Sequence, residues 1–181
     1  MSTSAGNVVT VTAHSTGCAR PQYEFWLRYP SGTLSRVTNF GSTATFSWSS
    51  TGQAPGSFTI SVWVNNLGDS TVTWEAYASA GVTLTGCTSA SLTPSGGSGT
   101  AGTSVKFTAH SSGCPTPMFE FWLEEPAGPV HLKQSFSSSS TWTWNTTGWA
   151  PGAYLIQVWA NSNGSDKSTW QALGSTTYTV N

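Results

Sequence analysis

The sequence is short of charge. It has 6 basic and 7 acidic side chains among 181 residues, or 7% charged residues, where about 25% is usual for a soluble domain. The formal net charge is −1, so the chain lacks a basic surface that could bind the phosphates of DNA or RNA. A basic helix that binds membrane surfaces is equally unsupported. We therefore expect no nucleic-acid partner and no insertion into a membrane.

Long apolar runs and helical periodicity are also missing. No apolar run approaches the roughly 20 residues of a transmembrane helix. The three histidines, His14, His110 and His131, do not cluster with other ligands as a zinc site requires. Neither a nucleophile-elbow motif nor a phosphate-binding glycine motif occurs. The sequence thus predicts no metal, no cofactor and no catalytic activity.

Serine, threonine, glycine and aromatic residues take the place of charge. Aromatic residues make up 13% of the chain, and 10 of them are Trp, which is enough to build hydrophobic cores and argues against disorder. Serine, threonine and glycine suit strands and turns better than helices. The composition therefore predicts an all-β protein.

The chain repeats itself with an offset of 96 residues. Residues 9–84 align without a gap to residues 105–180, and 33 of the 76 aligned positions are identical. A repeat of this length is two copies of one domain, with expected boundaries at 1–85 and 86–181. Only Thr85 and Gly86 separate the last expected strand of one copy from the first of the next, which predicts a stiff pair.

Short segments of alternating apolar and polar residues predict the strands of each copy. In the first copy they are residues 9–13, 23–27, 44–48, 58–64 and 71–84, the last with a bend near residues 78–81. Turn-forming residues separate these segments, including a hairpin turn at residues 65–68. The fold expected from this pattern is two tandem all-β sandwiches.

The spacing of the three cysteines predicts one disulfide. Residues that face each other across an antiparallel hairpin have a constant sum of residue numbers. Pairing Cys87 with Cys114 gives 87 + 114 = 201, which centres the hairpin in the glycine-rich stretch 94–102. We therefore expect a Cys87–Cys114 disulfide, with residues 94–102 forming a loop inside the second domain. A disulfide implies an oxidising compartment.

Cys18 is left over as a free thiol. Its partner would lie 96 residues before Cys87, ahead of Met1, so domain one is expected to lack its first strand. A fragment cut from a longer array is the favoured interpretation, and residues 1–6 do not look like a signal peptide. The alternatives are a Cys18 crosslink to another chain, a strand from elsewhere that fills the open edge, or a Cys18–Cys87 disulfide.

Several motifs carry a family resemblance. Trp48, the turn 54–56 and the alternating strand after it resemble the fibronectin type III pattern. More closely, residues 23–27 with the turn 30–32 and the pair Val62-Trp63 are similar to an immunoglobulin-like repeat found in tandem in large bacterial exported proteins. The resemblance implies two immunoglobulin-like sandwiches and a secreted or cell-surface location. It implies little about function, because such sandwiches host unrelated activities.

The candidate binding site is a pair of outward-facing tryptophans in each copy. In an immunoglobulin-like strand order, segments 23–27 and 58–64 are neighbours, and their outer side chains share one face. The candidate residues are Glu24, Trp26, Trp63 and Asn65 in the first copy and Glu120, Trp122, Trp159 and Asn161 in the second. Flat aromatics beside a carboxylate and an amide suit a sugar ring, by stacking and by hydrogen bonding.

Two functions of different classes follow from this pattern. One is a non-catalytic extracellular binding or adhesion module for a carbohydrate or another cell-surface polymer, presented twice for avidity. The other is a passive spacer in a larger exported protein. Exposed indoles at Trp26 and Trp63 favour binding. The spacer is favoured if these indoles face the core or are covered by the segment 71–84, which contains Trp74. As a third alternative, the tryptophans form a contact between domains or between chains.

Overall fold

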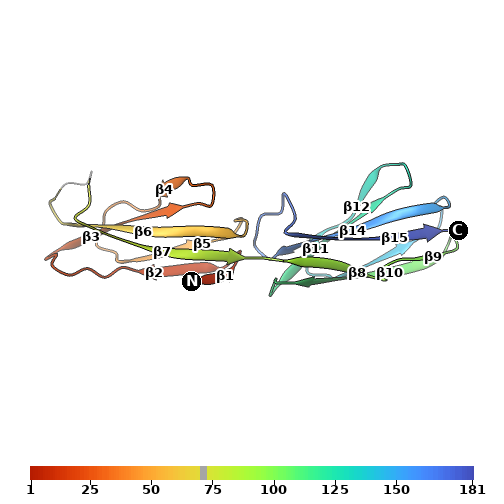
Figure 1. Cartoon of the computed structure of the whole chain (residues 1–181), viewed down its shortest axis with the longest axis horizontal. Helices are drawn as coiled ribbons and strands as arrows, with labels where there is room; N and C mark the ends of the chain where they lie inside the picture. The colour runs from red at the N-terminus through yellow and green to blue at the C-terminus, as the bar shows by residue number, and fades with distance from the viewer. Residues whose placement is uncertain (70–72) are drawn as a thin grey trace. The chain divides into compact units, whose positions relative to one another are not determined.

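The computed structural model describes residues 1–69 and 73–181, and these residues form strands and turns but no helix. They divide into two compact units, Met1–Thr85 and Gly86–Asn181, here called domain one and domain two (Figure 1). Each unit consists of two β-sheets around its own hydrophobic core. The predicted all-β fold of two sandwiches is confirmed. No helix able to span a membrane occurs in the described part of the chain.

Domain one has a five-stranded sheet in the order β1-β7-β6-β3-β4 and a two-stranded sheet, β2-β5. The strands are β1 (Ser2–Ser4), β2 (Val8–Thr12), β3 (Pro21–Arg28), β4 (Leu34–Arg36), β5 (Thr45–Ser49), β6 (Gly56–Asn66) and β7 (Ala76–Thr85). β1 runs parallel to β7, and the other pairs are antiparallel. Two packed, mainly antiparallel sheets make this an immunoglobulin-like sandwich.

Domain two has the sheets β12-β11-β14-β15-β9 and β13-β10-β8. The strands are β8 (Ser89–Thr93), β9 (Gly97–Gly99), β10 (Ser104–Ser112), β11 (Pro117–Glu124), β12 (Val130–Ser137), β13 (Thr141–Asn145), β14 (Gly152–Ser162) and β15 (Ala172–Val180). Seven of these strands repeat those of domain one about 96 residues later. Strand β8 has no counterpart among the described residues of domain one, so its second sheet has two strands instead of three.

Side-chain alternation decides which face of each strand is buried. On β3, Tyr23, Phe25 and Leu27 are buried in the core of domain one, and alternate residues of β6 are buried with them. Burying a large apolar side chain stabilises a fold by about 1.5–3 kcal/mol, and a slip of one residue would expose the whole set. Trp26 therefore faces outward, and the alternative in which it faces the core is wrong.

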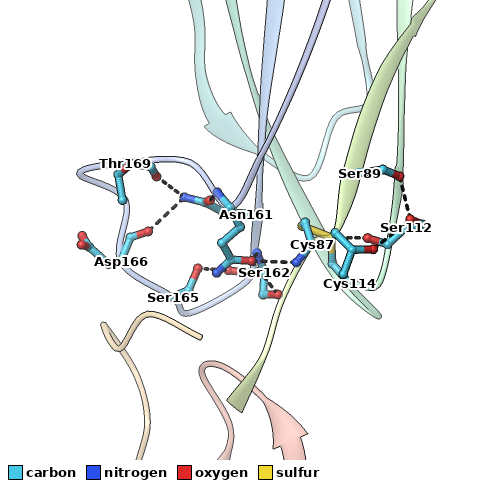
Figure 2. Close-up of a disulfide and its surroundings, with 11 residues drawn as sticks. Cys87, Ser89, Ser112, Cys114, Asn161, Ser162, Ser165, Asp166 and Thr169 are labelled. Carbon is cyan, nitrogen blue, oxygen red and sulfur yellow. Dashed lines mark hydrogen bonds between the residues drawn. A yellow bond between two sulfur atoms is a disulfide. The ribbon is translucent and has the colours of Figure 1, made fainter. Parts of the chain in front are cut away.

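The disulfide Cys87–Cys114 is present in domain two (Figure 2). Strands β8 and β10 are antiparallel, with Ser89 opposite Ser112 and Thr93 opposite Thr108. Both pairs of numbers sum to 201, as the hairpin arithmetic predicts, so the disulfide prediction is confirmed. Cys18 is a free, half-buried cysteine.

Several strands differ from the sequence prediction. The stretch 94–102, expected to be a loop, contains β9, which pairs with β15. Domain one lacks a counterpart of β8 but does have β1, the counterpart of β9, on β7. Three-residue strands show too little alternation to be recognised. Strands β4 and β12 were also not expected, because apolar residues such as Leu34 and Leu132 point to solvent there.

The last strand of domain one is continuous. The bend expected at residues 78–81 is wrong, because β7 pairs with β6 without a register shift from Ala76 to Leu84. Thr71 and Val72, the first residues of the expected segment 71–84, lie outside the described residues.

Candidate functional site

Strands β3 and β6 bring the candidate residues of domain one onto one face. The two strands are antiparallel neighbours, with Glu24 directly opposite Trp63. Trp26 and Asn65 lie two residues further along their strands and therefore on the same face. Domain two repeats this placement with Glu120, Trp122, Trp159 and Asn161 on β11 and β14. The four residue types thus share an outer sheet face in each domain.

The tryptophans of domain one form part of a longer aromatic row. The ring centroids are 4.7 Å apart for Trp26 and Trp63, 4.4 Å for Trp63 and Trp74, and 6.2 Å for Trp74 and Tyr77. We call these four residues the outer aromatic face of domain one. Trp26 and Trp63 are half-buried, whereas Trp74 is 48% and Tyr77 53% exposed. The accessible end of the row is therefore Trp74 and Tyr77.

The Glu24 carboxylate is buried beneath this row. Only 3% of Glu24 is exposed, the Trp26 Nε1–H donates to its Oε1 atom at 2.9 Å, and Arg36 Nη1 lies 3.6 Å from its Oε2 atom. A buried carboxylate needs such partners. In domain two the Trp122 Nε1–H donates to Glu120 in the same way, at 3.1 Å. Glu24 therefore orients the Trp26 indole, while Arg36 is the charged group at the surface.

Neighbouring hydroxyls fix the phenol of Tyr77. The oxygen atoms of Tyr77 and Ser61 are 3.4 Å apart. Hydrogen bonding with Ser61 and then Ser79 lowers the pKa of Tyr77 below its usual range, because it stabilises the phenolate. The ring is oriented by these contacts but stays exposed.

The two asparagines hold the loops that carry the outermost tryptophans. Asn65 Nδ2 donates to the Thr73 carbonyl at 2.7 Å, and the Glu75 N–H donates to Asn65 Oδ1 at 2.9 Å. Both asparagines are buried. The sequence suggests that these side chains contact a ligand directly. Instead, both amides hydrogen-bond to backbone groups of the protein. Their effect on the outer aromatic face is to position the segment before β7 or β15.

Asn161 makes the equivalent contacts in domain two (Figure 2). Its Nδ2 donates to the carbonyls of Asp166 at 2.9 Å and Thr169 at 2.7 Å, and the Gln171 N–H donates to its Oδ1 at 2.7 Å. The backbone N–H and then the hydroxyl of Ser168 donate to Asp166 and lower the pKa of its carboxyl. The loop before β15 is thus closed by its own polar groups.

Replacing Asn161 with Ala is expected to destabilise domain two by about 2 kcal/mol. The change removes the present partner of two carbonyls and one N–H. Thr169 is exposed and Asp166 and Gln171 are only partly buried, so water replaces part of what is lost, and the net cost stays within the range of about 1–3 kcal/mol for one unmet buried group. Urea denaturation followed by hydrogen exchange of β14 and β15 measures the loss. Replacing the exposed Asn163 with Ala is the control, and an equal effect there would contradict a specific role for Asn161.

The outer aromatic face of domain two differs at its edges. Trp122, Trp159 and Trp170 form a row with centroid distances of 5.1 and 4.6 Å, and Trp170 is 43% exposed. The exposed Leu132 and Leu173 occupy the places of Arg36 and Tyr77. The two outer faces therefore share their indoles but differ in the residues at the positions of Arg36 and Tyr77.

Sequence reasoning did not include Trp74, Tyr77, Trp170 and Arg36 among the site residues. A signal existed for two of them, because Trp74 and Trp170 are identical at the repeat offset of 96. Arg36 carried no signal, since β4 was not recognised and its pairing with Trp26 was unknown.

No group of three or more His, Cys, Asp or Glu side chains able to hold a metal occurs among the described residues. His131 Nε2 and Glu125 Oε1 form a half-buried pair at 2.6 Å. The carboxylates on the outer faces are occupied by indole N–H groups.

Comparisons with known proteins give structural likeness only. No family model matches the chain, and no curated protein matches it. Among solved structures, the N-terminal four Ig domains of Dscam1 isoform 8.4 align with 13% identity and a TM-score of 0.38, covering 100% of this chain and 43% of that chain. The N-terminal eight Ig domains of Down Syndrome Cell Adhesion Molecule isoform 1.30.30 align with 15% identity and a TM-score of 0.37, covering 100% and 25%. The chain thus spans less than half the length of these structures.

Proposed function

We propose that the chain is a non-catalytic extracellular binding module whose outer aromatic face in domain one binds a carbohydrate of a cell-surface polymer. The observation that carries the proposal is the row of four rings with Trp74 and Tyr77 at its exposed end. Exposed aromatic side chains that adjoin one another on a sheet need an explanation. A ligand that stacks on them is a direct one.

The chemistry around the row suits a sugar. The C–H face of a pyranose ring stacks on an indole, and its hydroxyls need hydrogen-bond partners at the rim. Arg36, on β4 opposite Trp26, supplies donors at one end of the row. Tyr77, on β7, supplies a hydroxyl held by Ser61 at the other end, so a chain of several sugar units would use both. Domain two has Leu132 and Leu173 at these places, so we assign the sugar site to domain one. An equal contribution of both domains to avidity is not part of this proposal.

The proposed location is supported by the disulfide. Cys87–Cys114 is expected to form and persist in an oxidising compartment. We propose a secreted or cell-surface protein, of the large bacterial exported type that the repeat resembles.

A passive spacer is the second candidate. Its support is that Glu24 and Asn65 direct their polar groups to partners inside domain one. Trp74 also packs on Trp63, and indoles covered by Trp74 are the arrangement expected for a spacer. In a spacer the aromatic row is a stabilising layer on the sheet and has no ligand.

The test is a glycan and polysaccharide array with the whole chain and with the Trp74→Ala variant. We expect binding to one glycan class, with a shift in Trp fluorescence, and a loss of about tenfold or more in affinity for Trp74→Ala. Trp74 is half exposed but packs on Trp63, so its removal should also cost about 1–3 kcal/mol of stability, and circular dichroism verifies that the variant is folded before binding is compared.

Two control variants separate the outcomes. Trp170→Ala makes the same change in domain two, and Val8→Ala trims an exposed residue of the other sheet of domain one. Both should bind like the unmodified chain. Loss of binding with Trp170→Ala alone would move the site to domain two. A blank array would favour the spacer.

A further inference from the structure

Domain one has a groove of about 470 Å³ along the open side of β2. Its walls include Val11, Ala13 and His14 from one sheet and Val62, Ala76 and Ala78 from the other. It therefore opens between the two layers of the sandwich, and at the β7 edge it is also lined by Ser61, Tyr77 and Ser79, so that it adjoins the Tyr77 end of the outer aromatic face.

Domain two shows what fills the equivalent groove. There β8 pairs with β10, so that Leu92 lies opposite Ala109 and Ser91 opposite His110. Leu92 is buried in the core. By the 96-residue offset, Ala109 and His110 correspond to Ala13 and His14. The residues that receive β8 in domain two thus line the groove in domain one.

The exposure of β7 confirms that a layer is absent there. Ala76 and Ala78 point toward the core side, because they pair with Val64 and Val62, yet both are exposed. Their counterparts in domain two, Ala172 and Gly174, are buried. The exposure of these core-facing alanines is explained by the absence of a strand equivalent to β8 over them in the described part of domain one.

The backbone of domain one is also ready to pair. The Ala13 N–H donates to Ala44 on the side of β5, so alternation turns the N–H groups of Thr12 and His14 to the open side. Strand β2 is five residues long, while its counterpart β10, paired on both sides, has nine. A strand edge with exposed donors and acceptors is a template for another strand.

We propose that this groove is a strand-acceptor site that binds an extended polypeptide segment from outside residues 1–181, with the residue pattern of β8. That pattern is a Leu-sized residue facing Ala13, small residues at alternate positions before it, and a cysteine five residues before the Leu. The partner is thus a β-strand that completes the three-stranded sheet by antiparallel pairing. The proposal does not depend on the proposed carbohydrate site.

A second copy of the chain is a poor donor. Its own β8 is held in domain two by the burial of Leu92 and by the Cys87–Cys114 disulfide. Swapping it out would require breaking that bond and exposing the core. A separate segment carries no such cost.

Cys18 provides a chemical reporter for docking. It corresponds to Cys114, which bonds to Cys87 at the start of β8. A docked strand with the pattern of β8 therefore brings its cysteine to Cys18. If that cysteine carries a thionitrobenzoate group as a mixed disulfide, the Cys18 thiolate attacks the peptide sulfur. The new disulfide forms, the old one breaks, and the coloured thionitrobenzoate anion leaves, with no net oxidation.

The experiment uses the whole chain and a synthetic peptide of residues 86–94, Gly-Cys-Thr-Ser-Ala-Ser-Leu-Thr-Pro, activated in this way. We expect release of thionitrobenzoate at least tenfold faster than with a scrambled peptide that keeps the cysteine in place. In urea that unfolds the chain, the two rates should become equal. A peptide with Leu92→Asp should react like the scrambled one, because the Asp would enter the apolar part of the groove.

A pair of protein variants tests the backbone pairing. His14→Pro removes the N–H that faces the open side, whereas His14→Ala keeps it, and Pro is tolerated on a strand edge. Circular dichroism verifies that both are folded. We expect slow, scrambled-like exchange for His14→Pro and fast exchange for His14→Ala. Equal rates for the native and scrambled peptides would overturn the proposal, as would dimers of the chain that exchange β8 and exclude the peptide.

Discussion

Replacing Cys87 and Cys114 together with Ala is expected to lower the free energy of unfolding of domain two by about 3–4 kcal/mol. The bond joins residues 27 apart in sequence, and closing a loop of that size removes conformational entropy from the unfolded chain. Cys87 is also buried, and its backbone N–H donates to Gln171 Oε1 at 2.9 Å. The bond therefore anchors β8 at the point where the chain enters domain two.

The measurement must distinguish the two domains of the intact chain. Hydrogen exchange in increasing urea, read by mass spectrometry, reports β8 and β10 separately from β2 and β5. We expect earlier opening of β8 and β10 in the double variant and no change in β2 and β5, because the bond lies inside domain two. Cys18→Ser is the control and should change neither domain. An unchanged urea midpoint for β8 would show that the bond adds little to stability.

The strands that carry the candidate site were predictable because their buried faces are strongly apolar. In residues 23–27 and 58–64 every second side chain is apolar, and this alternation alone turns Trp26 and Trp63 outward. The disulfide followed from the constant sum across a hairpin, which needs only the positions of Cys87 and Cys114. Alternation depends only on neighbouring residues and the hairpin sum only on one pair of positions, so both can be read directly from the sequence.

The exposure of the outer residues was not predictable in the same way. Glu24 and Asn65 lie on the outer face as expected, yet they are buried. Trp26 and Arg36 contact Glu24, and Thr73 and Glu75 contact Asn65. Such contacts depend on how a loop folds back over a sheet, which alternation does not encode. The same limit explains why Trp74 was considered as a cover and not as the exposed end of the row.

Replacing Gly174 with Val is expected to destabilise domain two by about 3 kcal/mol, at the upper end of the cost of overpacking. A Cβ atom built on Gly174 would lie 2.7 Å from the Ala90 carbonyl oxygen and 2.8 Å from the Ser91 nitrogen. These are backbone atoms of β8, and they cannot move aside as the end of a flexible side chain can. Valine would therefore push β8 off β15 and expose Leu92.

The matched variant in domain one is Ala78→Val. Ala78 corresponds to Gly174 and is exposed, because no described residue of domain one forms a strand over it. A larger side chain has room there and suits a strand, so we expect a change within about 0.5 kcal/mol. Urea denaturation combined with domain-resolved hydrogen exchange measures both variants on the same chain. Similar losses in the two domains would mean that β7 is covered in solution.

The same pair of positions also bears on the strand-acceptor groove. Gly174 lets the backbone of β8 approach β15 closely. Ala78 has a Cβ atom at the corresponding position, and we expect it to hold an incoming strand further from β7. Ala78→Gly should therefore raise the rate of peptide exchange at Cys18, and Ala78→Val should lower it. The valine variant would thus leave the stability of domain one unchanged while blocking docking. If Ala78→Val docks the peptide as fast as the native chain, the strand does not enter between the two sheets as β8 does in domain two.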